Sequence, residues 1–207
     1  MPRVTAVVIG HSYVRRLQEQ YESGRLPHRG PPELELRFVG IGGGRVSGGG
    51  DPRKNLFNYV SEVKSYHPDI IFIQAGENDI PYVSRHQVTQ GLLALARALA
   101  RECQPHTIIT GQLVHFPAHD PLGPVSKEIN HQLESYHPKR ALPTEGRTTL
   151  RFWRHKAGLY GENRAAYFSR DDVHLNMQGM KKFHNSVMAI VGKRAREVLL
   201  LWSAPRR

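Results

Sequence analysis

The stretch that decides the fold is VVIGHSYVRRL, residues 7–17. Its apolar half belongs to the run VTAVVI at 4–9, which predicts a buried β-strand. The run stops at a glycine, and the amphipathic segment 13–23 that follows has the spacing of a helix. His11 and Ser12 therefore stand where a strand turns into a helix. At such a place Ser12 is either a helix cap, the commoner role, or a nucleophile.

Short apolar runs alternate with helical patterns along the rest of the chain, as is typical of a parallel sheet covered by helices on both faces. No repeat or linker interrupts this order, so we predict a single doubly wound α/β domain over residues 1–207. The segment 69–76, DIIFIQAG, is apolar almost throughout and predicts a central strand. Further strands are expected at 33–39 and 106–114, and further helices at 52–66, 84–103, 124–135 and 177–201.

The composition is that of an ordinary globular protein, with 39% hydrophobic and 23% charged residues. No apolar run approaches the ~20 residues that span a bilayer, and MPRVTAVVIG is too short an apolar start for a signal peptide. The single cysteine, Cys103, can form neither an internal disulfide nor a cysteine-based zinc site. We therefore expect a cytoplasmic or nuclear protein without a membrane span.

The net charge of +11 is concentrated near the C-terminus: residues 139–207 carry 15 Lys and Arg against 5 Asp and Glu. A basic surface of this kind attracts nucleic acid, although a merely solvated face explains it equally well. Candidate nucleic-acid-binding residues are Arg151, Arg154 and Lys156, which surround two aromatic side chains. The plainer interpretation of this segment, a half-buried strand under a basic rim, is favoured.

Polar motifs follow the predicted strands at the point where each ends. His11 and Ser12 follow the first strand, the glycine-rich loop 40–50 the second, and GEND, residues 76–79, the third. The segment SRDDVHLNMQGM places Asp171 and His174 three residues apart before the last helix. Because ligands bind at the carboxyl ends of parallel strands, we expect these groups to meet at one edge of the sheet.

These blocks resemble those of the SGNH, or GDSL-like, hydrolase superfamily. The matching blocks are IGHSYV, VGIGGGRV, QAGENDI and DDVHLN, which span most of the chain. The closing pattern is also similar, more loosely, to SGNH-like proteins of aquatic animals and retrotransposons. The resemblance implies a flavodoxin-like α/β/α sandwich with a central parallel sheet of about five strands, and it implies no cofactor. It assigns Ser12 as nucleophile, His174 as general base and Asp171 as the group that orients the base.

The resemblance also implies a hole for the oxyanion, formed by the Ser12 N–H, the Gly43 N–H and the Asn78 side-chain amide. Gly43 aligns best with the glycine of the second block, although Gly42 and Gly44 leave that register open. The implied function is a serine esterase that cleaves a small carboxylic ester through an acyl-enzyme. The alternative is an SGNH scaffold with weak or no activity that binds nucleic acid through its basic C-terminal third.

One departure from the family pattern is His11, which stands where the family usually has aspartate. We expect it to be a structural turn residue rather than a second base. Asp79 and Asp172 are interpreted as local hydrogen-bonding groups. The trio His115, His119 and Asp120 is interpreted as part of a loop rather than a metal site, because Pro117 breaks the helical spacing.

Overall fold

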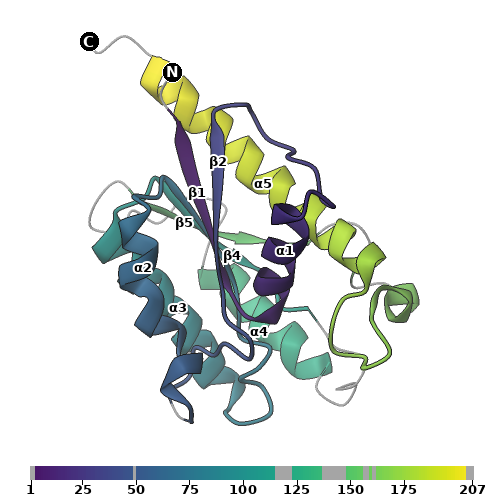
Figure 1. The fold of residues 1–207 in the computed structure, drawn as a ribbon. Coiled ribbons are helices and arrows are strands. Elements are labelled where there is room, and N and C mark those ends of the chain that lie inside the picture. Colours follow the sequence, from purple (N-terminus) through teal and green to yellow (C-terminus); the bar gives the residue numbers. More distant parts are fainter. Residues whose placement is uncertain are drawn as a thin grey trace.

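The computed structural model describes residues 3–48, 50–114, 123–136, 148–155, 159 and 162–203. Five strands form one parallel sheet in the order β2-β1-β3-β4-β5 (Figure 1). This is the strand order of flavodoxin-like folds, so the predicted fold class is confirmed. The strands are β1 (Val4–Gly10), β2 (Leu34–Gly40), β3 (Ile70–Gln74), β4 (Thr107–Gly111) and β5 (Thr149–Trp153).

Helices cover both faces of the sheet, which gives three layers (Figure 1). One face carries α1 (Ser12–Glu22) and the long α5 (Met177–Ser203), and the other carries α2 (Val60–Ser65), α3 (Arg85–Cys103) and α4 (Gly123–Tyr136). Within the described part of the chain, no helix combines the length and hydrophobicity needed to cross a membrane.

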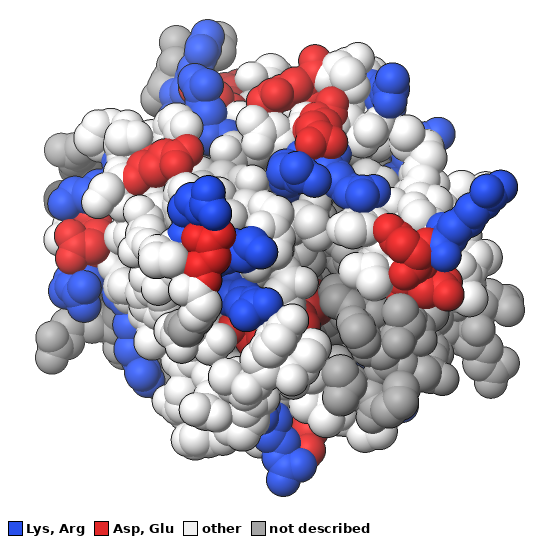
Figure 2. All heavy atoms as spheres, turned by 60° about the horizontal axis from the view of Figure 1, so that its bottom comes forward, with Lys and Arg blue, Asp and Glu red and all other residues white. Residues whose placement is uncertain are grey.

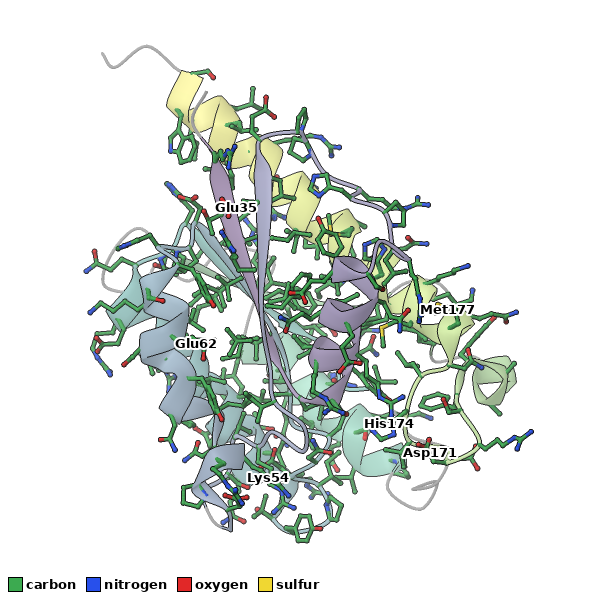
Figure 3. The ribbon with its side chains drawn as sticks, in the orientation of Figure 1. Glu35, Lys54, Glu62, Asp171, His174 and Met177 are labelled. Atoms are coloured by element: carbon green, nitrogen blue, oxygen red, sulfur yellow. The ribbon has the colours of Figure 1, made fainter. Side chains whose placement is uncertain are left out.

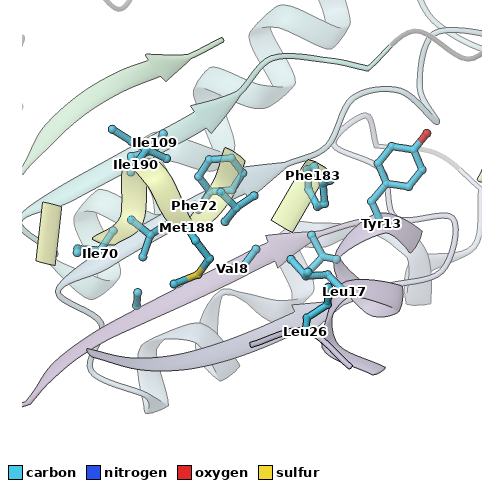
Figure 4. Packing of buried hydrophobic residues seen from close by; sticks show 14 of the residues in the cluster. Val8, Tyr13, Leu17, Leu26, Ile70, Phe72, Ile109, Phe183, Met188 and Ile190 are labelled. Carbon is cyan, nitrogen blue, oxygen red and sulfur yellow. The ribbon is translucent and has the colours of Figure 1, made fainter. Parts of the chain in front are cut away.

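The two cores follow from the alternation of side chains along the central strands. In β3, Ile70 and Phe72 pack toward α1 and α5, whereas Ile71 and Ile73 pack toward the opposite helices. All four are fully buried. Figure 4 shows the first core, where Phe72 lies among side chains from β1, α1 and α5. Both faces of the central strands are therefore apolar, as the sequence of this segment predicts.

The predicted helix at 52–66 is wrong in its first half. The structure has two short 3₁₀ turns, Pro52–Lys54 and Leu56–Tyr59, before α2 begins. Asn55 separates the turns, because its backbone is extended and its side chain accepts a hydrogen bond from the Phe57 N–H. That side-chain bond competes with the backbone hydrogen bonds of a helix, so one helical turn ends before Asn55 and another begins after it.

The topology places the loops of interest at one end of the sheet. Strand order reverses at β1, so β1 and β3 are neighbours whose connections leave on opposite faces. In open α/β sheets the crevice at such a switch point is where ligands bind. The loops after β1, β2 and β3 all begin there.

Candidate active site

His11, not Ser12, caps the N-terminus of α1. The His11 backbone is extended, and its ring Nδ1 accepts a hydrogen bond from the Tyr13 N–H at 3.3 Å. Ser12 is the first residue of the helix itself. Its hydroxyl has no hydrogen-bond partner among the described residues, so it is not used as a cap. The commoner interpretation of a serine at a helix start therefore does not apply here.

His11 is also one half of a buried pair. Its Nε2 lies 2.8 Å from the Glu77 carboxylate, and both side chains are almost completely shielded from solvent. Because Nδ1 is an acceptor, Nε2 carries the proton that is donated to Glu77. Burial opposes the ionisation of Glu77, but the His11 ring and the Val114 N–H outweigh it and hold the pKa of this carboxyl below its usual value. The prediction that His11 is a structural turn residue is confirmed.

Three consecutive residues after β3 tie the loops together. Glu77 contacts His11 in the first loop, and the Asn78 amide donates to the Gly44 carbonyl in the second at 3.1 Å. Asp79 is buried and accepts hydrogen bonds from the N–H groups of Val46 and Ser47. It is the local hydrogen-bonding group that the sequence predicts. The first and second loops are thus fixed against the third.

The glycine-rich loop offers two unoccupied backbone donors. Gly43 has φ +69°, a conformation that favours glycine. The N–H of Gly44 donates to the Ile41 carbonyl, whereas those of Gly42 and Gly43 have no acceptor among the described residues. Gly44 is therefore the least suited of the three glycines to bind an anion.

Asp171 and His174 form a hydrogen-bonded pair on the loop that precedes α5 (Figure 3). The His174 Nδ1 lies 2.7 Å from one Asp171 oxygen, and the other oxygen accepts the His174 and Val173 N–H groups at 2.9 and 3.0 Å. These bonds hold the pKa of Asp171 well below its usual range. With Nδ1 bound to the carboxylate, Nε2 is the ring nitrogen left to accept a proton.

A buried tyrosine joins this loop to the start of α1. Tyr13 is fully buried, and its hydroxyl donates to the Val173 carbonyl at 2.8 Å. Tyr13 follows Ser12, and Val173 precedes His174. The hydrogen bond therefore connects the immediate neighbours of the two residues across 160 positions of sequence.

A second buried network lies beside the first. The His155 Nε2 contacts the Gln74 side-chain carbonyl at 2.8 Å, and its Nδ1 contacts the Ser186 hydroxyl at 3.0 Å. The Gln74 amide donates to Glu77, so the chain of bonds runs from α5 to the residue that holds His11. Burial lowers the pKa of His155 to about 4.

This lowered pKa predicts a pH-dependent loss of stability. The unfolded chain binds a proton at His155 near pH 6.5 and the folded protein only near pH 4, so stability is complete above pH 6.5 and falls below it. The loss amounts to about 3 kcal/mol by pH 4. We expect urea unfolding at several pH values to show a shallower loss in His155→Gln than in the wild type over this range. Parallel curves would contradict the assignment.

The candidate nucleic-acid-binding residues that the structure describes are only partly free to contact a ligand. Arg154 forms a two-bonded ion pair with Glu134 of α4, and Arg151 is half-buried on β5. Phe152 and Trp153 pack against the two cores, as the plainer interpretation of this strand predicts. The structure gives the nucleic-acid prediction no support. Lys156, His115, His119 and Asp120 lie outside the described residues.

Sequence reasoning missed the groups that hold the candidate site together. Neither the partner of His11 nor the tyrosine bond carries a local signal, because the partners are 66 and 160 residues apart. For Glu77 the sequence offers only a general clue, since a carboxylate close to the end of a buried strand requires a partner but does not identify it.

Comparisons with known proteins bear on the family and the fold of the chain. The family model described as GDSL-like Lipase/Acylhydrolase matches residues 38–187. A search of curated proteins finds no match. Among solved structures, a carbohydrate esterase family 3 protein from Talaromyces cellulolyticus is similar with a TM-score of 0.64 and 12% identity, over 94% of this chain and 99% of that one. A mutant acetyl esterase with acetate ion has a TM-score of 0.63 and 13% identity, over 94% and 99%. At this identity the two structures show the fold alone.

Proposed function

Because the chain belongs to the GDSL-like lipase/acylhydrolase family of SGNH hydrolases, we propose that it cleaves carboxylic esters with Ser12 as nucleophile and His174 as general base. The substrate in this proposal is a small ester with a short acyl or acetyl group. The similar solved structures include an acetyl esterase and a carbohydrate esterase, which fits a short acyl group.

In the proposed reaction, the His174 Nε2 takes the proton of the Ser12 hydroxyl as the oxygen attacks the ester carbonyl. The tetrahedral intermediate then expels the alcohol, which receives that proton, and leaves an acyl-enzyme. A water molecule deprotonated by the same imidazole releases the acid and restores the serine. Asp171 holds the imidazole through Nδ1 and stabilises its protonated form.

The oxyanion of the intermediate would be stabilised by the N–H groups of Ser12 and Gly43 and by the Asn78 amide. The Ser12 N–H lies at the positive end of α1. The Asn78 amide has two hydrogens, and the one donated to Gly44 leaves the other available.

The observation that carries the proposal is that His11 caps α1 and leaves the Ser12 hydroxyl unused, while Tyr13 ties the serine to the loop of the Asp171–His174 pair. The test is hydrolysis of 4-nitrophenyl acetate by the purified protein. We expect turnover that falls on acidification, because a protonated imidazole cannot accept the serine proton. No turnover above the buffer rate at any pH would contradict the proposal.

Asn78→Ala tests the oxyanion assignment. We expect kcat for 4-nitrophenyl acetate to fall about 10²- to 10³-fold, because one donor to the developing charge is lost. The matched control is Asn58→Ala, an exposed asparagine whose amide donates to the Pro52 carbonyl. An Asn78 variant with the kcat of the control would remove Asn78 from the oxyanion hole.

A further inference from the structure

An open cavity of about 400 Å³ lies between α1 and the start of α5. Its apolar wall is formed by Leu175, Met177 and Met180. The opposite wall consists of polar side chains of α1, among them Arg15 and Arg16. The remaining lining residues are Glu19, Gln20, Ser169 and Asn176.

The cavity carries an excess of positive charge. Arg15 and Arg16 face a single lining carboxylate, that of Glu19. Glu19 lies 3.9 Å from the Arg15 guanidinium, a loose and half-exposed pair. Arg16 has no carboxylate within ion-pair distance among the residues that the structure describes. One of the two guanidinium charges is thus uncompensated.

Residues that line the cavity are close in sequence to both proposed catalytic residues, although Ser12 and His174 do not line it themselves. Arg15 and Arg16 follow Ser12 by three and four residues on α1, so all three lie on neighbouring parts of one helix face. Four residues correspond to about 6 Å along the helix. On the other side, Leu175 directly follows His174. Backbone positions on both sides of the cavity thus lie within about 6 Å of a proposed catalytic residue.

Arg15 and one further cation, Lys54, border the glycine-rich loop. The Arg15 guanidinium carbon lies 3.8 Å from the position that a Cβ on Gly42 would occupy, and the Lys54 Nζ lies 3.7 Å from that of Gly43. Figure 2 looks onto this end of the molecule, where Lys and Arg side chains are interspersed with Asp and Glu side chains. Two cationic side chains thus lie beside the glycines proposed for the oxyanion hole.

We propose that this cavity binds a negatively charged group of the substrate, so that the preferred ester carries an anionic substituent held by Arg15 and Arg16. The inference rests on the proposed function and adds the substrate's charge to it. An organic anion fits both walls, because its carbon skeleton can contact Leu175 and Met180 while its charge meets the guanidinium groups.

The test compares charged esters with neutral ones of nearly the same shape. Mono(4-nitrophenyl) succinate and its methyl ester differ in charge on the acyl side, and 4-acetoxybenzoate and its methyl ester differ on the alcohol side. We expect the wild type to prefer the charged member of at least one pair in kcat/KM by about tenfold. The Arg15→Gln/Arg16→Gln double variant should lose this preference, and added salt should reduce it in the wild type.

The control is Arg101→Gln, which removes one positive charge from α3, away from the cavity. Arg101 pairs with Glu102 there. Its preference should equal that of the wild type. Equal rates for both members of each pair in the wild type, or a preference that survives in the double variant, would overturn the inference. If neutral esters are still hydrolysed in that case, the proposed function stands and only the charge preference fails.

A binding measurement tests the inference without requiring the protein to hydrolyse an ester. Calorimetric titration of the Ser12→Ala protein with succinate and with 4-hydroxybenzoate should detect binding of at least one anion. Adding the two arginine substitutions should weaken that binding about tenfold. Absence of binding by both anions, or equal binding with and without the arginines, would contradict the inference even in a protein that hydrolyses no ester.

Discussion

Ser12→Ala is expected to lower kcat for 4-nitrophenyl acetate by at least about 10⁴-fold, and His174→Ala to lower it comparably. The serine supplies the attacking oxygen and the imidazole accepts its proton, so each is useless without the other. The double variant should accordingly be no slower than the worse single variant. Rates at saturating ester and equal protein concentration provide the measurement.

Ser23→Ala and His131→Ala are the matched controls. Ser23 lies at the other end of α1 and donates to the Gln20 carbonyl, and His131 is exposed on α4. Both should retain wild-type kcat. A Ser12→Ala protein that keeps more than about a tenth of the activity would mean that another group performs the attack.

His11→Asp restores the residue that the family usually has, yet we expect it to lower the free energy of unfolding by about 3–5 kcal/mol. In this chain the His11 ring donates to Glu77 in a fully buried position. An aspartate there would face the Glu77 carboxylate, and two buried acids cannot both be ionised without a large cost. Urea unfolding at pH 7 measures the loss.

The second substitution Glu77→Gln should recover part of that loss when it is combined with His11→Asp. The amide can donate to the aspartate, and the aspartate can still accept the Tyr13 N–H that His11 accepts now. His86→Asp, on an exposed surface of α3, is the control and should change stability by less than about 0.5 kcal/mol. Equal stability of His11→Asp and the wild type would show that the pair contributes nothing.

The strands were predictable because each central strand is buried on both faces and leaves an apolar run in the sequence. The ends of the strands were harder to predict. The apolar run 69–76 continues through Ala75 and Gly76, but β3 ends at Gln74. Gly76 has φ +112°, which turns the chain out of the strand direction. At Asn55, the hydrogen bond from the Phe57 N–H to the side chain likewise interrupts a segment whose apolar spacing predicts one helix.

The Asp171–His174 pair was predictable because its geometry is local, three residues apart on one loop. The His11–Glu77 pair was not, since it exists only because β1 and β3 are neighbours in the sheet. The same holds for His155 and Gln74, which are 81 residues apart. Local spacing thus predicts a pair such as Asp171–His174, and strand order determines which distant side chains contact each other.

Labelling with a fluorophosphonate and locating the adduct by peptide mass spectrometry tests the central claim most directly. An activated serine at the start of α1 predicts one adduct, on Ser12, that forms far more slowly in His174→Ala. An unlabelled protein, or an adduct on a different serine with Ser12 unmodified, would contradict the account.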